Sequence, residues 1–153
     1  ITEKKLIGKS NRMSLNYDHT VELWKSFMPQ LKEVQGRVDE NLYNLKIFED
    51  GFDPMKFTSD TPFLKWAAVE VEDYGMEPEG FQRYLLVGGL YAVFLHQGPA
   101  SSFHQTLQSI YEDWFPGSPY ELDDREHFER FTKNYHPNAP ESVEEVWIPI
   151  KIR

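Results

Sequence analysis

Alternation of apolar and polar residues marks much of the chain and predicts strands, because successive side chains of a strand point to opposite faces. Residues 62–73 are typical, since Trp66, Ala68 and Glu70 fall on one face of such a strand. Stretches that contain Gly and Pro separate the alternating segments and predict loops. We predict strands over residues 4–15, 42–50, 62–73, 124–133 and 142–153, and a pair of strands over 81–99 hinged at Gly88 and Gly89.

Two further segments have the three-to-four-residue spacing of an amphipathic helix. The first stripe begins at Val21, and Asp18 or Thr20 can cap its start. Pro29 lies inside this pattern, so we expect the helix to end or kink near Met28.

The second helical segment runs roughly from Ser102 to Trp114. Ser102 and Gln105 form a capping-box pattern at its start. Pro116 and Gly117 predict its end. Its apolar stripe consists of Phe103, Leu107, Ile110 and Trp114.

The order of these elements is strand–helix–strand–strand, and then the same order again. We therefore predict one α+β domain over residues 1–153, with a first repeat over about 1–80 and a second over about 81–153. Helices would pack on an antiparallel sheet. The seam between two such halves is a natural place for a ligand pocket.

Composition narrows the classes of partner. The net charge is −9, with 25 acidic residues against 16 basic ones, and this balance disfavours binding to a phosphate backbone. The acidic balance favours cationic ligands instead. No apolar run approaches the roughly 20 residues that span a bilayer, and no apolar signal core opens the chain. We therefore expect a cytoplasmic protein that binds neither DNA nor membrane.

The sequence contains few of the residue patterns that bind metals or cofactors. Cysteine is absent, and the five histidines show no H-x-x-x-H spacing. The sequence contains no P-loop, no G-x-G-x-x-G and no G-x-S-x-G motif. We expect no metal site and no cofactor.

Glu145 is the first candidate for a functional residue. It lies two positions before Trp147 in the apolar stretch VWIPI, so the two side chains share a strand face. Burial of an ionised glutamate without a partner costs several kcal/mol. We expect Glu145 to remain unsatisfied until something pairs with it, and a ligand cation can do that, with aromatic rings adding cation–π attraction. Alternatively, its surroundings raise its pKa and it acts as a general acid or base. A solvent-facing glutamate on an edge strand is the plainer alternative.

Three other residues join this candidate site. Tyr91 lies on the strand before the second helix, and its hydroxyl needs a partner if it is buried. Trp66 and Glu70 form a second aromatic–acidic face on the strand over 62–73. A core position for Tyr91 and a solvent-facing one for Glu70 are the plainer alternatives.

An ordered set of motifs, most of them in the second half of the chain, resembles the gyrase-inhibitor-like (GyrI-like) family, the effector-binding domain of AraC-type transcriptional regulators. The resemblance covers nearly the whole chain. The motifs that carry it are YAVFLHQGP (91–99), IYEDWFPGSPY (110–120), HFERF (127–131) and EEVWIPIK (144–151), with AAVEVED (67–73) and the following Pro78-Glu79-Gly80.

The resemblance implies two strand–helix–strand–strand repeats about a pseudo-two-fold axis, with an aromatic-lined pocket at the seam. The family's central glutamate falls on Glu145, and its aromatic neighbours fall on Trp147 and Tyr91. Trp66 and Glu70 follow less securely, because that strand varies more in the family.

The resemblance also implies the function. The leading hypothesis is a stand-alone bacterial domain that binds hydrophobic, cationic small molecules, with a role in drug sensing or resistance. The first alternative is a hydrolase that opens cyclopropane-containing or other reactive hydrophobic compounds, with Glu145 and Tyr91 as catalytic residues. The second is a protein-interaction role like that of gyrase inhibitors. A helix-turn-helix segment is missing, so we do not expect direct transcriptional control.

Overall fold

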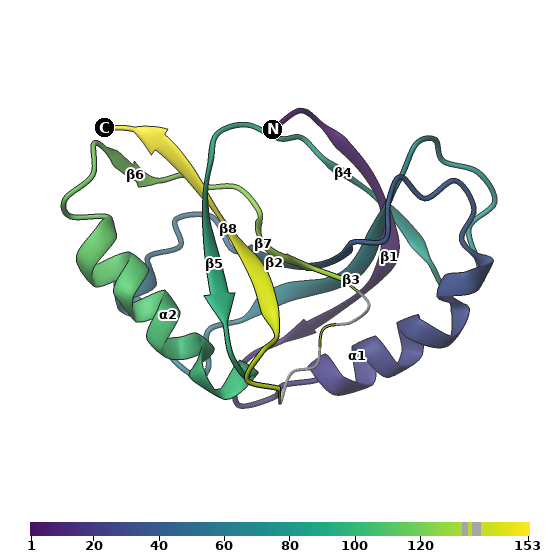
Figure 1. Ribbon diagram of the computed structural model, residues 1–153, viewed down its shortest axis with the longest axis horizontal. Helices are drawn as coiled ribbons and strands as arrows, with labels where there is room; N and C mark the ends of the chain where they lie inside the picture. The colour runs from purple at the N-terminus through teal and green to yellow at the C-terminus, as the bar shows by residue number, and fades with distance from the viewer. Residues whose placement is uncertain (133–134, 136–138) are drawn as a thin grey trace.

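One antiparallel sheet of eight strands dominates the computed structural model, and two α-helices lie on one side of it (Figure 1). The structure describes residues 1–132, 135 and 139–153. The predicted α+β class is confirmed. The strands are β1 (Lys4–Met13), β2 (Leu42–Phe48), β3 (Phe63–Val71), β4 (Gln82–Leu86), β5 (Tyr91–Gln97), β6 (Tyr120–Leu122), β7 (His127–Phe131) and β8 (Val143–Ile152).

The first helix, α1 (Thr20–Phe27), ends where the sequence predicts. A 3₁₀ helix, η1 (Met28–Glu33), follows it directly, and Pro29 stands at its start. Proline cannot donate the backbone hydrogen bond that would continue the α-helix. Leu23 and Phe27 of α1 pack on Phe63 and Val69 of β3, which lie on the same side of the sheet.

The second helix begins with a 3₁₀ turn, η3 (Ala100–Ser102), continues as α2 (Phe103–Ser109) and ends in a π-helical segment, η4 (Ile110–Trp114). Its extent matches the prediction, but the capping box is wrong. The Ser102 hydroxyl donates to the Pro99 carbonyl at 2.8 Å and makes no cap to the helix. The preceding 3₁₀ turn holds Ser102 away from the extended backbone that a capping residue requires.

The strand order is β4-β1-β3-β2-β7-β8-β5, with β6 paired to the end of β8. The elements β1, α1, β2 and β3 give the strand order β1-β3-β2, and β5, α2, β7 and β8 give β5-β8-β7. The two sets meet at the β2–β7 pairing, which is the seam between them. The pseudo-two-fold axis and the repeat boundaries stay predictions.

Gly88 and Gly89 join the two edges of this sheet. β4 and β5 are consecutive in the chain yet lie at opposite edges, and five residue steps from Leu86 to Tyr91 span at most roughly 18 Å. The sheet must therefore curl until its edges approach. Both glycines have positive φ, at 93° and 128°, and a Cβ on Gly88 would lie 2.6 Å from the Ile1 carbonyl oxygen. Only glycine fits this link.

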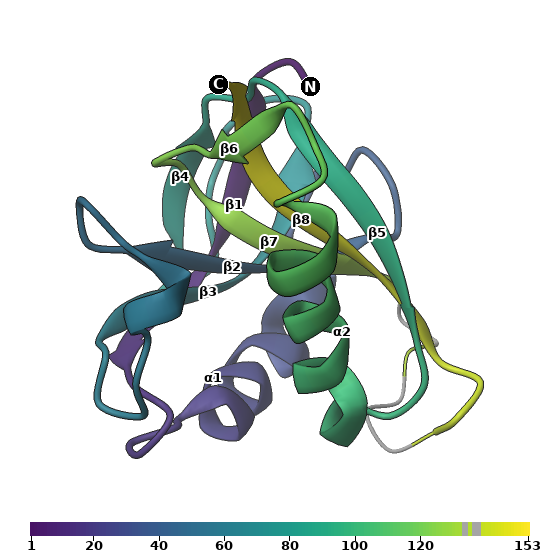
Figure 2. The same ribbon diagram turned by 90° about the vertical axis from the view of Figure 1, so that its left-hand side faces the viewer.

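The curl gives the sheet two distinct faces. The helix face is the side that α1 and α2 cover, and Figure 2 shows both helices on this same side. The inner face is the side enclosed by the curl. A cluster of mostly aromatic and aliphatic side chains fills the inner face, with Tyr43, Leu45, Trp66 and Phe128 at its centre. Within the described residues, neither helix is long and apolar enough to cross a membrane.

Candidate functional site

All five predicted site residues lie on the inner face. Alternation along β8 places Glu145 and Trp147 there, while Glu144 and Val146 point to the helix face. Tyr91 lies opposite Pro149 on the neighbouring strand β5. The other two, Trp66 and Glu70, reach the same face from β3.

Trp147 stands in the middle of an aromatic layer. Phe128 lies opposite it on β7, and the two rings stack at a centroid distance of 5.1 Å with 14° between their planes. Tyr91 approaches from the other side, edge to face, at 5.8 Å. The layer forms an apolar aromatic wall beside Glu145.

Glu145 has its pairing partner within the protein, whereas the sequence pointed to a ligand cation as a partner. Arg130 lies opposite it on β7, and the Arg130 Nε–H donates to Glu145 Oε1 at 2.5 Å. The Trp147 indole N–H donates to the same oxygen at 3.3 Å. The sequence did not indicate this partner because it comes from another strand, and only the register of β7 against β8 brings the two together.

Arg130 also lies over the Trp147 ring, with its guanidinium carbon 5.1 Å from the ring centroid. The guanidinium thus makes an ion pair with Glu145 and a cation–π contact with Trp147. These are the two contacts that we expected of a bound ligand cation. In the structure, both contacts are made by the protein's own Arg130 side chain.

The pKa of Glu145 follows from this pairing. Burial alone would raise it, but the hydrogen bonds from Arg130 and Trp147 and the charge of Arg130 lower the pKa below its ordinary value. Glu145 is thus ionised at neutral pH and is a weak base.

Glu70 is paired as well. The Lys4 ammonium lies 3.3 Å from Glu70 Oε1, and the Tyr43 hydroxyl donates to the same oxygen at 3.4 Å. Tyr43 lies opposite Arg130 across the β2–β7 seam. A polar row therefore crosses the inner face from Glu70 through Tyr43 and Arg130 to Glu145.

Trp66 lies at the buried end of the inner face and is 5% exposed. Its ring is tilted against Tyr84 at 5.2 Å. Among the residues that the structure describes, nothing accepts a hydrogen bond from its indole N–H. Trp66 is therefore part of the aromatic floor and keeps one free donor.

The sequence did not single out Glu126, which lies beside this floor. The Tyr84 hydroxyl donates to its carboxylate at 2.7 Å, and the Tyr91 hydroxyl donates to its backbone carbonyl at 2.9 Å. These bonds answer the need of the Tyr91 hydroxyl for a partner. Burial, reinforced by Glu126, raises the pKa of both tyrosines, so both are neutral at physiological pH.

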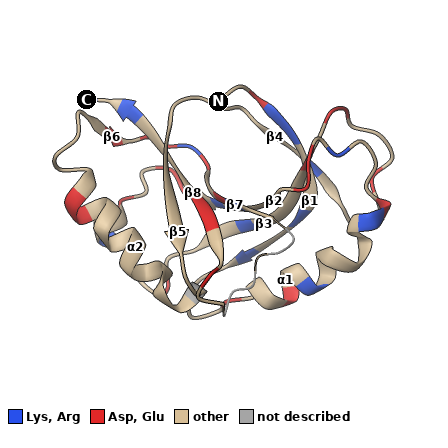
Figure 3. Cartoon of the chain, in the orientation of Figure 1, with Lys and Arg blue, Asp and Glu red and all other residues tan. Residues whose placement is uncertain are grey.

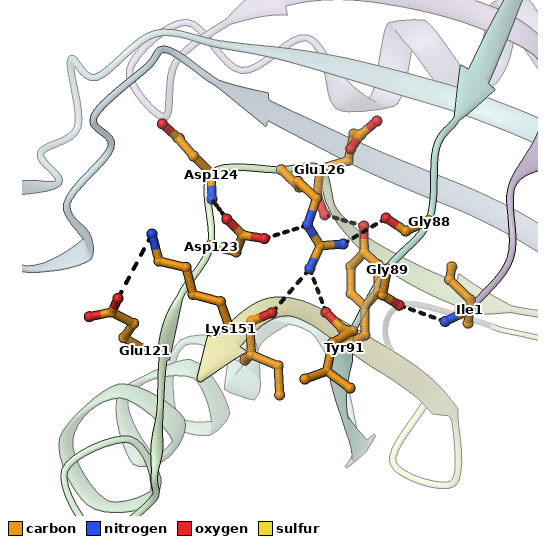
Figure 4. Close-up of polar contacts among 12 residues, drawn as sticks. Ile1, Gly88, Gly89, Tyr91, Glu121, Asp123, Asp124, Glu126 and Lys151 are labelled. Atoms are coloured by element: carbon orange, nitrogen blue, oxygen red, sulfur yellow. Dashed lines mark hydrogen bonds and ion pairs between the residues drawn. The ribbon is translucent and has the colours of Figure 1, made fainter. Parts of the chain in front are cut away.

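Arg125 closes the end of the sheet next to Tyr91, in the region where Figure 4 shows Asp123, Gly88 and Tyr91 close together. Its guanidinium pairs with Asp123 at 2.7 Å and donates to the carbonyls of Gly88, Leu90 and Ile150. It also lies 4.7 Å from the centroid of the Tyr91 ring. With so many acceptors, Arg125 has a structural role, whereas Arg130 pairs with the Glu145 carboxylate and interacts with the Tyr43 side chain.

A cavity of about 480 Å³ adjoins the Arg130–Glu145 pair. Leu95 and Val143 contribute apolar surface to it, and Asn41, just before β2, borders it on the other side. Its size is within the range of roughly 300–1,000 Å³ for small-molecule sites. A ligand in this cavity would meet the ion pair first. Among the described residues, no cluster of His, Asp and Glu side chains is suited to a metal ion.

Comparison with known proteins agrees with this fold. The family described as "GyrI-like small molecule binding domain" matches residues 1–151. The chain is 27% identical over 130 residues to the transcriptional regulator BrlR of Pseudomonas aeruginosa. The match covers 84% of this chain and 45% of BrlR, so the chain spans less than half of that relative.

Three solved structures share the fold at 12–16% identity. SAV2435 bound to tetraphenylphosphonium has a TM-score of 0.73 over 99% of this chain and 90% of its own. EcmrR in a complex with DNA has a TM-score of 0.72 over 100% of this chain and 56% of its own. A hydrolase from Listeria innocua has a TM-score of 0.63 over 99% and 89%.

Proposed function

Because the chain belongs to the GyrI-like family of small-molecule-binding domains, we propose that it binds hydrophobic cations on the inner face, with Glu145 as the charge anchor. One observation carries the proposal. Arg130 already makes the ion pair with Glu145 and the cation–π contact with Trp147 that a ligand cation would make. A ligand would displace the Arg130 guanidinium and take over both contacts. Trp147 and Tyr91 would contact its apolar body beyond the cavity, which Glu145 lines and the other four predicted residues do not. Trp66 and Glu70 lie on the same face, with Trp66 in the aromatic floor.

The pair is exposed enough for this exchange. The Arg130 side chain is 24% exposed and that of Glu145 is 32% exposed, so solvent weakens their attraction. A hydrophobic cation loses less hydration than a guanidinium when it enters an aromatic site. The ligand also gains the apolar surface of the cavity at roughly 25 cal/mol per Å² buried. Both differences favour the ligand over Arg130.

The geometry favours binding over hydrolysis. A general base works best with a pKa near the working pH, yet pairing with Arg130 lowers the pKa of Glu145. The Tyr91 hydroxyl already donates to a backbone carbonyl. The likeness to the Listeria innocua hydrolase concerns the fold alone. Hydrolysis with Glu145 and Tyr91, and a gyrase-inhibitor-like role, stay predictions.

Two probes of the same shape and opposite charge test the proposal. Tetraphenylphosphonium, the molecule bound to SAV2435, should bind in a calorimetric titration, and tetraphenylborate should not displace it. Displacement at equal concentrations would show that the site recognises shape without charge, and the cation proposal would fail.

We further propose that residues 1–153 do not themselves bind duplex DNA. Basic and acidic positions are interspersed over the strands and loops in Figure 3, and the net charge is −9. The likeness to EcmrR covers 56% of the EcmrR chain. A gel-shift assay at about 0.15 M salt should show no complex. Micromolar binding with a steep salt dependence would contradict this, and a role in sensing drugs would then act through DNA directly.

A further inference from the structure

A second cavity, of about 540 Å³, lies on the helix face. α2 forms one wall, the loop after β2 forms another, and the seam strands form the floor. The aromatic part of the wall comes from this loop and the end of β2, where Phe48 and Phe52 stack at 3.8 Å and Phe57 meets Phe52 edge to face. Phe103 and Leu107 of α2 face them across the cavity. Size and lining are those of a small-molecule site.

Two lysines meet on the floor of this cavity. Lys46 of β2 and Lys65 of β3 lie directly opposite each other, and both line the cavity. Like charges at directly opposed positions of a sheet destabilise it. Lys46 is neutralised by Glu129, whose carboxylate lies 2.8 Å from its ammonium.

Lys65 lacks such a partner. It is 8% exposed, and its ammonium donates one hydrogen bond, to the Thr20 hydroxyl at 2.8 Å. That hydroxyl in turn bonds the exposed Asp18 at 2.5 Å. Over residues 1–132, 135 and 139–153, no carboxylate lies within ion-pair distance of Lys65. An ammonium has three donors, so two remain for another acceptor.

The other charged groups around Lys65 do not give it a carboxylate partner among the described residues. Burial lowers the pKa of Lys65 to about 8, and Lys46 adds to the decrease while Glu129, Asp18 and Glu144 oppose it. Lys65 is thus mostly protonated at neutral pH. The acids at the rim have other partners, since Asp18 accepts from Thr20 and Glu112 accepts from Gln108.

From this juxtaposition we propose that the helix-face cavity is a second ligand site, for amphipathic carboxylates. The carboxylate of the ligand would pair with Lys65 at the deep end. The apolar body would lie between the aromatic rings of the loop and Leu107 of α2. The preference for charge is the opposite of the one on the inner face.

Two naphthalene probes with the same body test the choice of head group. The probes are 2-naphthoate and the neutral 2-naphthamide, each titrated into the protein and followed by calorimetry. An ion pair at Lys65 should make 2-naphthoate bind about 10- to 100-fold more tightly than the amide. Equal affinities would overturn the proposal, and so would displacement of 2-naphthoate by tetraphenylphosphonium, because that cation is assigned to the inner face.

Matched lysine variants locate the contact. Lys65→Met removes the charge and keeps the length of the side chain, and it should abolish the preference for 2-naphthoate over the amide. The control is Lys9→Met. Lys9 also donates to a hydroxyl of α1, that of Ser26 at 2.7 Å, but does not line the cavity. An unchanged preference in Lys65→Met, or the same loss in both variants, would refute the assignment of Lys65.

A third variant tests the cavity without touching its charges. Leu107→Trp adds bulk from α2, which should weaken the binding of 2-naphthoate at least tenfold if the cavity holds the probe. A thermal melt of each variant establishes that it is folded. If folded Leu107→Trp binds 2-naphthoate as wild type does, the probe binds elsewhere and the proposal fails.

Discussion

Glu144 and Glu145 are neighbours on β8, yet the two faces of the sheet give them opposite properties. Glu145 on the inner face is ionised, because Arg130 and Trp147 lower its pKa. Glu144 on the helix face is 6% exposed, and burial raises its pKa to about 7. One strand therefore carries a ready anion on one face and a carboxyl group near its titration point on the other. The comparison shows that the partner contributed by the next strand decides what an acidic residue can do.

The same contrast holds for the cations. Arg130 on the inner face is paired and partly exposed, whereas Lys65 on the helix face is buried and bonded to a hydroxyl. Neighbouring residues of β7 belong to different faces, since Phe128 and Arg130 lie on the inner face while Glu129 lies on the helix face. Each face thus has its own set of charged residues. A substitution on one face should leave the charge interactions of the other face unchanged.

The largest expected effect is on the inner face, from Trp147→Ala. Trp147 stacks on Phe128 and contacts Tyr91, so the variant leaves a cavity in a packed aromatic layer. We expect the free energy of unfolding to decrease by about 3–5 kcal/mol. Chemical denaturation measures this, and Trp147→Phe, which keeps a stacking ring, is the control. A loss below about 1 kcal/mol would show that the layer does not hold the inner face together.

The next largest effect is the pH dependence of stability that Glu144 causes on the helix face. The folded protein binds the Glu144 proton more tightly than the unfolded chain does, so Glu144 makes stability fall as pH rises from about 4.5 to about 7. Over this pH range, the contribution of Glu144 to the free energy of unfolding falls by about 3 kcal/mol. His127 acts in the opposite direction, because burial lowers its pKa to about 3 and stability rises with pH between about 3 and 6.5. The charged groups near Glu144 are Glu129, Lys46 and Lys65, with His96 opposite it on β5.

Glu144→Gln isolates this contribution from that of His127. Relative to wild type, the variant should gain stability progressively between pH 4.5 and 7, as measured by denaturation at several pH values. A difference that stays constant over this range would mean that Glu144 keeps an ordinary pKa, and the contrast with Glu145 would disappear.

The smallest effect tests the competition on the inner face. Arg130→Gln removes the internal cation, so tetraphenylphosphonium no longer has to displace it. We expect binding up to about 5-fold tighter by calorimetry, since a partly exposed pair is worth about 1 kcal/mol or less. Arg125→Gln is unsuitable as a control because that arginine holds the sheet closed. Weaker binding in Arg130→Gln would mean that Arg130 helps to form the site.

Local patterns in the sequence predicted most of the elements. Alternation located seven of the eight strands, and the three-to-four-residue stripes located both helices. β6 was missed because its three residues, Tyr120–Leu122, are too few to show alternation and depend on pairing with the end of β8. The capping box was wrong because a 3₁₀ turn before α2 changes the backbone at Ser102.

The candidate site was predictable only as far as it is local. Glu145 and Trp147 share a face because they are two residues apart, and the structure places them so. Arg130 was missed, although its alternation with Phe128 in HFERF could have placed it beside them. Knowing that it meets Glu145 requires the register of β7 against β8, which no local pattern contains. The surroundings of Lys65 could not be predicted for the same reason, since its neighbours come from β2 and α1.

The most direct test titrates tetraphenylphosphonium into Glu145→Gln and Glu144→Gln, two identical changes one residue apart on opposite faces. Glu145→Gln keeps the size of the side chain and removes the anchor charge, so affinity should fall by about 2–5 kcal/mol, roughly 30- to 4,000-fold. Glu144→Gln should bind as wild type does. If Glu145→Gln binds the cation as tightly as wild type, or if both variants lose affinity equally, Glu145 is not the anchor of a cation site on the inner face.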